Sequence, residues 1–597
     1  MERVNKSIHL TTNGHYEIDL PFKNPNVILP KNKSHAEQRL EYLRRRFLKE
    51  PDFFNEYKNF VKVMIDNGYA EKVNNSEEYD GKTWYLSHHG VRHPEKKSLR
   101  VVFDCSAKFS GLCLNDVLLQ GPDLANNLVG VLARFRKKSV AIQGDIRAMF
   151  HQVKVSEPHR DSFGGEIAMS HNLCTVNDVY DAYYVDDFLD SKPNAEEAIY
   201  HVKNVRNLVS KGGFEITKWV SNDRAVLLSI PEEHRAKDVK GLDLSVDDLP
   251  VEKALGMIWN VKQDTLCFRV KRKDKPATKG GLLSTINSIF DPLGFGQPVL
   301  QPMKLKVLIQ DLCRKKFDWD DPIPPELKKE WSKWLSDLPK LKNFNVPRCY
   351  TPKYFGKIID MQLHHFSDAS EKSYGAVAYI RITNTYGQVH CANISGKTRL
   401  VPLNGSTIPR LELCAAKISA KNDAFLKKEL KLPISASYFW TDSTTVLRYL
   451  ANTDKIFESF VANRVNLIKE TSEIEQWRYV PSQLNPADVA SRRLSVDAFL
   501  NCQYWKFGPD FLWQAAEEWP SQPDFINDCS TDNLGARKES IQCFSNTACE
   551  KSFWIDNWTQ WKRICSCRNQ AELLDSKEDF ISEENYQQLC LVQKKAA

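Results

Sequence analysis

Two adjacent carboxylates, Asp186 and Asp187, interrupt the apolar run AYYVDDFL (182–189). Neighbouring like charges repel each other and disfavour a buried strand, so the pair needs a compensating charge. The flanking residues are β-formers and are too few for a helix, which predicts two short strands that meet in a hairpin with both carboxylates at its tip. Divalent cations would relieve the repulsion there, because Mg²⁺ is typically bound by a few carboxylates together with phosphate oxygens.

A third acidic residue is needed if two metal ions are to carry out phosphoryl transfer, since such sites use about three carboxylate-type anchors. Asp145 meets this need. It follows the apolar stretch SVAIQG (139–144), which predicts a strand that runs directly into the carboxylate. The three residues together predict a site for two Mg²⁺ ions, with Mn²⁺ as the alternative metal, that acts on phosphodiesters.

Four further acidic residues stand at the ends of predicted elements in the second half of the chain. Asp368 ends a predicted strand, and Asp442 lies where a later strand passes into a helix. Glu412 is expected in the first turn of a helix, and Asp488 at the start of another, where the helix dipole lowers the cost of negative charge. Any one of them alone is more typical of a helix cap than of a metal ligand. Their order, Asp-Glu-Asp-Asp over 121 residues, indicates a second cluster.

The residues around the first group resemble a known family. YVDD (184–187) is similar to the Y-x-D-D motif of reverse transcriptases, and GDIRAMFHQVKV (144–155) resembles their first palm motif. The resemblance extends over about residues 15–520 and implies a fragment of a pol polyprotein from the Pao/BEL group of LTR retrotransposons. Further stretches similar to the polymerase region of that group are HYEIDLPFKNPNVILP (15–30), LRVVFDCSAKFSGLCLNDVLLQGPDL (99–124), GGFEITKWVSN (212–222) and ALGMIWN (254–260).

The resemblance to reverse transcriptases implies roles for particular residues. Asp145, Asp186 and Asp187 would be catalytic and would hold two magnesium ions. Phe150 stands where these enzymes carry an aromatic steric gate, which would exclude a ribose 2′-OH and so select deoxynucleotides. The implied partners are an RNA or DNA template–primer and deoxynucleoside triphosphates. The residues expected to bind the incoming nucleotide are Arg100, Phe150, Tyr184 and Lys218.

The second group resembles the ribonuclease H fold, in which a central sheet collects four carboxylates around two magnesium ions. This resemblance implies that the cluster cleaves the RNA strand of an RNA–DNA hybrid. An aspartic peptidase is excluded, because its D-[ST]-G turn needs a glycine that the sequences SDAS and TDST lack. The residues implied to be catalytic and metal-binding are Asp368, Glu412, Asp442 and Asp488.

The interval between Asp145 and Asp186 departs from the reverse transcriptase pattern. It spans 41 positions, whereas the family places a hairpin and a long helix there, and a helix of about 20 residues alone is about 30 Å long. HRDSF (159–163) begins the expected continuation, but GGEIAMSHNLCTVNDVYD (164–181) has no counterpart. Three explanations stay open: an internal deletion in the element, a coding stretch omitted from the gene model, or a gap filled differently in a working protein.

The predicted function is therefore an RNA-directed DNA polymerase with a ribonuclease H-like nuclease, whose polymerase half is impaired. The helix that the family places in the interval forms part of the wall behind the template and the incoming base. Without it the metal anchors could persist while polymerisation is lost. The alternative is a non-catalytic retrotransposon relic that binds nucleic acid.

The elements that must position these residues follow from the hydrophobic patterns. Two amphipathic helices are expected over 35–66, and short strands alternate with helices over 80–265 and again over 361–500. Residues 282–340 are expected to be mostly helical. The alternation predicts a multidomain protein of the α/β and α+β classes, with an incomplete polymerase palm and fingers followed by a ribonuclease H-like domain.

The 597 residues exceed what one core supports. Five domains are expected: an N-terminal helical extension (1–80), reverse transcriptase fingers and palm (81–268), a helical thumb or connection (269–358), the ribonuclease H-like domain (359–500), and a Trp-rich segment with a polar tail (501–597).

Composition restricts the cellular setting. The net charge of +7 permits a nucleic-acid partner without demanding one. The 15 cysteines are scattered, which is typical of reduced thiols. The N-terminus lacks the pattern of a secretory signal, and no run of about 18 apolar residues predicts a membrane span. A cytoplasmic location is expected, with the nucleus as the alternative, and the oligomeric state is left open.

Overall fold

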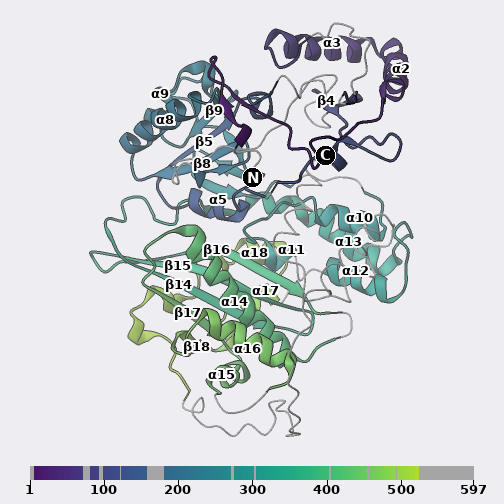
Figure 1. Ribbon diagram of the computed structural model, residues 1–597. Coiled ribbons are helices and arrows are strands. Elements are labelled where there is room, and N and C mark those ends of the chain that lie inside the picture. Colours follow the sequence, from purple (N-terminus) through teal and green to yellow (C-terminus); the bar gives the residue numbers. More distant parts are fainter. Residues whose placement is uncertain are drawn as a thin grey trace, which may run out of the picture. The chain divides into compact units, whose positions relative to one another are not determined.

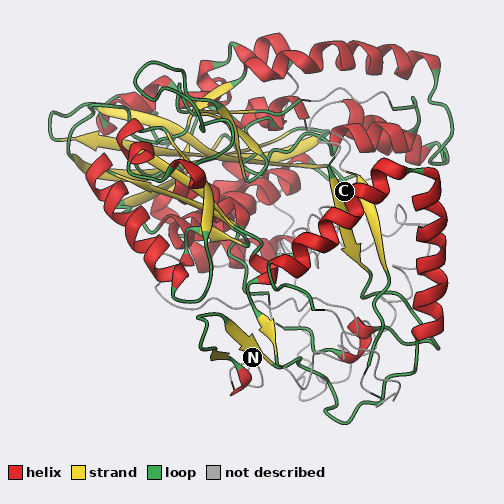
Figure 2. Cartoon of the chain, turned by 90° about the horizontal axis from the view of Figure 1, so that it is seen from above, coloured by secondary structure: helices red, strands yellow, loops and turns green. Residues whose placement is uncertain are grey.

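The computed structural model divides the chain into two compact units, Met1–Pro250 and Val251–Ala597 (Figure 1). No helix in the described part of the chain combines the length and the apolar character that crossing a bilayer requires. Helices and strands both run through the ribbon (Figure 2), which confirms the predicted mixed α/β class. The structure describes residues 6–71, 81, 83–92, 98–121, 123–156, 180–270, 275–300, 304–402, 405–452, 457–491 and 494–523.

The first unit contains a pair of helices packed on a β-hairpin. The helices predicted over 35–66 are present as α2 (Lys33–Lys49) and α3 (Pro51–Asp66). Pro51 is tolerated as the first residue of α3, because the N–H that proline lacks would have no partner within the helix at that position. They pack on β3 (His88–Arg92) and β4 (Leu99–Phe103), which pair antiparallel. The buried residues between them are Leu43, Phe53, Tyr57 and Val101.

A small three-stranded sheet precedes the main sheet of this unit. It has the order β1-β2-β6, with β2 and β6 parallel. Its strands and the nearby short helix are β1 (His9–Leu10), β2 (Tyr16–Ile18), β6 (Lys154–Val155) and α4 (Leu114–Val117).

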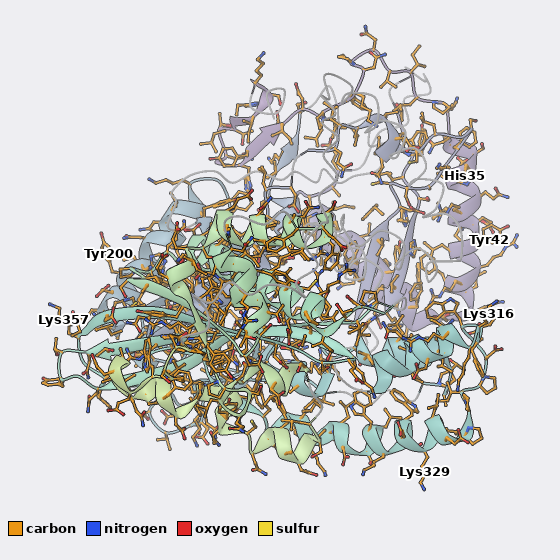
Figure 3. The ribbon with its side chains drawn as sticks, turned by 90° about the horizontal axis from the view of Figure 1, so that it is seen from below. His35, Tyr42, Tyr200, Lys316, Lys329 and Lys357 are labelled. Atoms are coloured by element: carbon orange, nitrogen blue, oxygen red, sulfur yellow. The ribbon has the colours of Figure 1, made fainter. Side chains whose placement is uncertain are left out.

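The main sheet of the first unit is antiparallel and has the order β7-β8-β5-β9. Helix α8 lays an apolar stripe of alanine and valine on it, and Asn194 caps the helix by accepting a hydrogen bond from the Glu197 N–H at 2.9 Å. Tyr200 lies on the opposite side of α8 and projects from the ribbon, as does Tyr42 on α2 (Figure 3). The elements are α5 (Leu128–Phe135), β5 (Val140–Ile146), η1 (Met149–His151), β7 (Tyr183–Tyr184), β8 (Asp187–Lys192), α8 (Ala195–Ser210), β9 (Ile216–Ser221), α9 (Arg224–Leu228) and η3 (Glu232–His234).

The second unit begins with a four-stranded antiparallel sheet whose last strand comes from about 80 residues further along the chain. Because β12 pairs with β13, the stretch from Val251 onward belongs with the helices that follow, and the division falls at Pro250. The predicted domain limits, including the one at 268, stay predictions. The elements are β10 (Val251–Ala254), β11 (Met257–Asn260), β12 (Thr265–Cys267), α10 (Lys279–Ile286), α11 (Gln297–Leu300), α12 (Lys304–Arg314), α13 (Pro325–Asp337), η4 (Leu338–Asn343) and β13 (Asn345–Pro347).

A five-stranded sheet in the order β16-β15-β14-β17-β18 forms the centre of the second unit. The first three strands are antiparallel and long, and β17 and β18 run parallel to β14. Its strands are β14 (Ile358–Ala369), β15 (Ser373–Asn384), β16 (Val389–Leu400), β17 (Ala436–Thr441) and β18 (Trp477–Tyr479).

Alternate residues of β14 face opposite layers, as a pleated strand requires. His365 bonds to Asp423 of α14 at 3.0 Å on one face. Phe366 contacts Phe511 of the C-terminal segment on the other. The helices of this unit are α14 (Ile408–Leu430), α15 (Thr444–Ala451), α16 (Ser459–Thr471), η5 (Ile474–Gln476), η6 (Ser482–Leu484), α17 (Ala487–Ser491), α18 (Val496–Leu500), α19 (Gln503–Phe507), η7 (Asp510–Trp513) and η8 (Ala516–Glu518).

The loop between α10 and α11 packs directly on β16. Gly294 has φ +72°, and a Cβ there would lie 1.7 Å from the carbonyl oxygen of Gly396, so both the backbone conformation and the close approach require glycine. The Trp505 indole N–H donates to the Phe295 carbonyl at 2.8 Å. Residues near 290 are therefore an integral part of the layer around the five-stranded sheet.

Candidate active sites

Asp368 and Asp442 stand side by side at one end of the five-stranded sheet. Strands β14 and β17 are parallel, and their last paired residues are Ser367 and Thr441. Asp368 directly follows Ser367, and Asp442 directly follows Thr441. Both aspartates therefore stand at the carboxyl ends of their strands, on the same side of the sheet. Their carboxylates lie close enough to repel each other. The predicted positions, at the end of a strand and at a strand-to-helix junction, are confirmed.

Asp488 lies in α17, a helix of five residues that packs on β14 and β15. Asn485, which is buried, places the start of this helix. Its side-chain N–H donates to the Ser367 carbonyl at 3.0 Å, and its side-chain oxygen accepts from the Ala487 N–H at 3.1 Å. Asp488 is thus held at a helix start, as predicted, and its charge also acts on Asp368.

Ser491 fixes the other end of α17. Its carbonyl accepts hydrogen bonds from the hydroxyls of Ser373 at 2.7 Å and Ser370 at 2.9 Å, in the turn between β14 and β15. The Ser491 hydroxyl donates to Oδ2 of Asp368. The helix that carries Asp488 is therefore joined at both ends to the strand that carries Asp368.

Glu412 is in the second turn of α14, and its predicted place in the first turn is wrong. The helix begins at Ile408, because Thr407 precedes it in an extended conformation and Pro409 is accommodated in the first turn. The first turn contains no acidic residue, so the expected help from the helix dipole is absent. A hydrogen bond takes its place: the Ser443 hydroxyl donates to Oε2 of Glu412 at 2.6 Å.

The electrostatics of this cluster favour protonation or a cation. Burial raises the pKa of Asp368 to about 7, and the charges of Asp442 and Asp488 add to the rise, against the hydrogen bond from Ser491. Burial also raises the pKa of Glu412, and the charge of Asp442 adds to it, against the hydrogen bond from Ser443. Asp368 and Glu412 thus stand among like charges that disfavour their ionised forms.

One carboxylate oxygen of Asp442 has no hydrogen-bond partner among the described residues. Oδ1 of Asp442 is buried and makes no hydrogen bond, whereas Oδ2 accepts from the Ser482 hydroxyl. A buried acceptor without a partner is costly, and a divalent cation would satisfy it. Within the described residues, no three His, Cys, Asp or Glu side chains are grouped so that they could hold a metal ion by themselves. Two-metal sites take further ligands from substrate phosphate, so these carboxylates fit such a site.

The first predicted group comes together in the sheet of the first unit. Asp145 on β5 lies directly opposite Asp187 on β8 in the antiparallel register, and Tyr184 on β7 lies opposite Asp187 on the other side. The hairpin turns through Val185 and Asp186, as predicted. Val185 has φ +57°, which is unusual for a β-branched residue and is typical of tight turns at functional sites.

Lys218 reaches this group from β9. It adopts φ +55° at an irregularity in the pairing of β5 with β9, where one extra residue on β9 forms a bulge. Its ammonium group lies 2.6 Å from Oδ2 of Asp145. The Lys218 side chain is 66% exposed and that of Asp145 is 23% exposed, so the pair is open to solvent. A cation from the chain itself therefore compensates the first aspartate.

The other residues predicted to bind the nucleotide are less closely grouped. Phe150 is half-buried in η1, which follows β5 after a turn through Ala148 with φ +45°. Arg100 is exposed on β4, in a different sheet from the aspartates. The unmatched interval 164–181 lies outside the described residues except for its last two positions.

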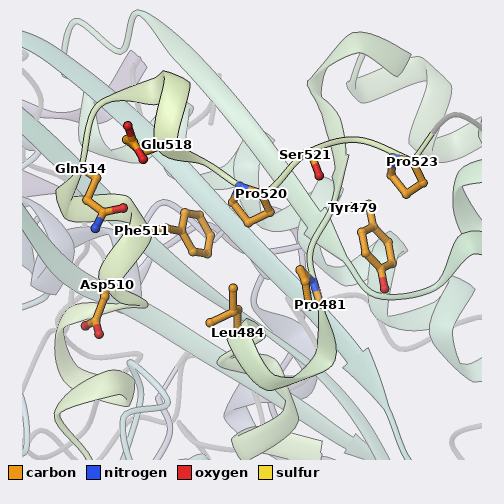
Figure 4. A pocket seen from close by; sticks show the side chains of 10 residues that line it. All are labelled: Tyr479, Pro481, Leu484, Asp510, Phe511, Gln514, Glu518, Pro520, Ser521 and Pro523. Atoms are coloured by element: carbon orange, nitrogen blue, oxygen red, sulfur yellow. The ribbon is translucent and has the colours of Figure 1, made fainter.

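A pocket of about 520 Å³ borders the loop that carries Ser482. Figure 4 shows the side chains of Leu484, Phe511 and Pro520 facing the same space. The carboxylates in its lining make it unsuited to a phosphate group. The lining residues are Tyr479, Pro481, Leu484, Asp510, Phe511, Gln514, Glu518, Pro520, Ser521 and Pro523.

The sequence analysis missed the polar residues that hold the carboxylates: Asn485, Ser443, Ser482 and Ser491. Each stands in or next to a short helix, where serine and asparagine are common as caps, and that role alone would explain them. Ser443 does cap α15, since its side chain accepts a hydrogen bond from the Val446 N–H at 3.1 Å. Only the contacts across the fold show that its hydroxyl hydrogen is directed to Glu412.

A family model identifies part of the second unit. Residues 278–443 match the model described as the Pao retrotransposon-like RNaseH-like domain. The predicted Pao-type resemblance and the predicted ribonuclease H-like domain are thereby confirmed for this stretch, which includes Asp368, Glu412 and Asp442. No curated protein sequence matches the chain.

Solved structures of the foamy viral protease-reverse transcriptase are similar to the chain at low identity. The dRH form in complex with double-stranded DNA is 12% identical, with 71% of this chain and 69% of that chain covered and a TM-score of 0.46. The complex with an RNA/DNA hybrid is 13% identical over 71% and 52% of the two chains, with a TM-score of 0.44. The complex with double-stranded DNA is 12% identical over 72% and 83%, with a TM-score of 0.44.

Proposed function

We propose that the second unit hydrolyses the RNA strand of an RNA–DNA hybrid, since residues 278–443 match a ribonuclease H-like family model. The observation that carries the proposal is the placement of Asp368 and Asp442 at the ends of adjacent parallel strands. Asp488 and Glu412 approach the same edge from α17 and α14, and their interactions with the two strand-end residues join them into one group.

The residues of the chain bind and orient in this proposal. The four carboxylates would hold Mg²⁺, with Mn²⁺ as the alternative. When bound, such ions supply an activated water and stabilise the leaving 3′ oxygen. Burial of Asp368 excludes bulk water from the base of the cluster, which strengthens its interaction with a cation. Asn485 and the carbonyl of Ser491 keep α17 in place, so that Asp488 does not have to be ordered when substrate binds.

Cleavage of a labelled RNA–DNA hybrid by the full chain tests the proposal. Asp442→Asn should reduce the rate at least about a hundredfold, because it removes a ligand charge that is worth several kcal/mol in the transition state. Asp497→Asn is the matched control, since its carboxylate is 65% exposed and forms a surface ion pair with Lys340. Equal cleavage by the wild type and Asp442→Asn would remove the nuclease assignment.

A polymerase centre in the first unit is the second candidate function. The cross-strand pairing of Asp145 with Asp187, and the turn that presents Asp186, favour it. Its substrates would be a template–primer and deoxynucleoside triphosphates, bound by Arg100, Phe150, Tyr184 and Lys218. The interval of 41 positions between Asp145 and Asp186 is the reason to propose that this half is impaired.

Primer extension on poly(rA)/oligo(dT) tests the second candidate. We expect weak or no synthesis, and robust magnesium-dependent synthesis would overturn the impairment. The rival class, a non-catalytic relic, predicts hybrid binding without cleavage and without synthesis. Fluorescence anisotropy with a labelled hybrid, measured beside the two activity assays, separates the relic from either enzyme.

A further inference from the structure

Three serine hydroxyls each bond to one carboxylate of the nuclease cluster. Ser443 donates to Oε2 of Glu412 at 2.6 Å, and Ser482 donates to Oδ2 of Asp442. Ser491 donates to Oδ2 of Asp368. The serines come from three places in the chain, namely the cap of α15, the start of η6 and the end of α17. Three of the four acidic side chains of the cluster thus accept a hydrogen bond from one serine hydroxyl each.

The backbone fixes two of these hydroxyls in place. The oxygen of Ser443 accepts from the Val446 N–H at 3.1 Å, so its own hydrogen is free to point at Glu412. Ser491 is held through its carbonyl by Ser370 and Ser373, independently of its hydroxyl. These two contacts are therefore built into the fold.

The contacts occupy one oxygen of each of these three carboxylates. At Asp442 the two oxygens differ, because Oδ2 accepts from Ser482 and Oδ1 is buried with no hydrogen-bond partner among the described residues. A carboxylate with one oxygen held by a hydroxyl is suited to bind a cation through the other oxygen only. Binding through both oxygens would make the cation share the second oxygen with the hydroxyl hydrogen, which weakens the hydrogen bond and disfavours this arrangement.

This difference separates magnesium from calcium. Mg²⁺ takes six ligands at about 2.0–2.1 Å in an octahedron, whereas Ca²⁺ takes about 6–8 oxygens at about 2.3–2.6 Å and often binds both oxygens of a carboxylate. We propose that Ser443, Ser482 and Ser491 make the nuclease cluster selective for Mg²⁺ and Mn²⁺ over Ca²⁺ by disfavouring metal binding through both oxygens of the three carboxylates to which they bond. The inference rests on the proposed function, since it assigns metal ions to this cluster.

Direct metal binding by the full chain tests the inference. Isothermal titration with Mg²⁺ and with Ca²⁺ gives the ratio of the two dissociation constants for the wild type, for Ser482→Ala and for the triple variant Ser443→Ala/Ser482→Ala/Ser491→Ala. Asp442→Asn, titrated in parallel, gives the binding that belongs to other sites. We expect the ratio to move toward Ca²⁺ by about tenfold in the triple variant and in the same direction in Ser482→Ala, since a hydrogen bond to a charged group is worth about that factor.

Two controls keep the test sharp. Ser495→Ala removes the serine that caps α18 by accepting from the Ala498 N–H at 3.2 Å. Ser482→Thr retains the hydroxyl, and both variants should therefore keep the wild-type ratio. Ser482 is exposed, so its alanine variant tests the inference even if the triple variant does not fold.

The outcomes distinguish the inference from the function on which it rests. An unchanged ratio of the Mg²⁺ and Ca²⁺ dissociation constants in Ser482→Ala, with cleavage lost in Asp442→Asn, would overturn the role of the serines and leave the nuclease standing. Equal cleavage by Asp442→Asn and the wild type would remove the nuclease itself. A shifted ratio together with loss of cleavage in Asp442→Asn supports both.

Discussion

The two carboxylate groups of this protein are compensated in different ways. In the first unit, Asp145 pairs with the ammonium group of Lys218 at 2.6 Å, and the pair is open to solvent. In the second unit, Asp368 is 4% exposed and faces the like charges of Asp442 and Asp488, so that its pKa is raised to about 7 by burial and by those charges. Among the residues that the structure describes, the Ser491 hydroxyl and the Ala369 backbone N–H donate to its carboxylate.

This difference in charge compensation indicates how strongly each carboxylate group depends on protons and cations from the solution. An exposed aspartate with its own lysine is already neutralised, and such pairs contribute little to stability. A buried set of like charges is costly until a proton or a metal ion is bound. The second group is therefore the one whose behaviour should depend most strongly on pH and on divalent cations.

The largest expected effect separates the two groups by activity. Asp368→Asn should lower hybrid cleavage at least about a hundredfold, because it removes a buried ligand charge. Asp145→Asn should leave cleavage within about twofold of the wild type, since it belongs to the other unit. Single-turnover cleavage rates check both, and a large loss in Asp145→Asn would show that the groups do not act separately.

The next effect is stabilisation by metal. Saturation with Mg²⁺ should raise the free energy of unfolding by about 2.7 kcal/mol at a hundred times the dissociation constant. Thermal unfolding of the wild type with and without Mg²⁺ measures this shift. The same titration of Asp442→Asn should give a much smaller shift, whereas an equal shift in both proteins would place the bound metal elsewhere.

A stability effect of similar size should follow pH. The pKa of Asp368 is raised from 3.8 to about 7, so between about pH 4 and pH 7 the folded chain keeps a proton that the unfolded chain releases, and stability falls as pH rises. In Asp368→Asn this fall in stability with rising pH is absent, because asparagine does not titrate. In metal-free urea unfolding the variant should therefore be more stable than the wild type by about 2–4 kcal/mol at pH 8. The gain should disappear near pH 4.

The smallest effect is expected in the first unit. Lys218→Met removes an exposed ion pair and should change the free energy of unfolding by less than about 1 kcal/mol, with a difference that shrinks as salt is added. Urea unfolding at low and high ionic strength measures it. A loss of several kcal/mol would mean that Lys218 holds the bulge of β9 as well as Asp145.

Much of the local structure could be predicted from the sequence, because it depends on neighbours along the chain. The tip of the β7–β8 hairpin follows from β-formers on both sides of Asp186 and Asp187. The places of Asp368 and Asp442 at strand ends follow in the same way. Glu412 was placed one turn too early, since it is the fifth residue of the helix that begins at Ile408 and so lies in the second turn.

The sequence by itself determined which residues carry charge and which elements end at them, since propensity and periodicity are local properties. Only the tertiary structure decided how each charge is compensated. A lysine 73 positions after Asp145 reaches it through a strand bulge, and a serine 123 positions after Asp368 reaches it from a short helix. Such contacts depend on the register of strands and the packing of helices, which no stretch of sequence specifies alone.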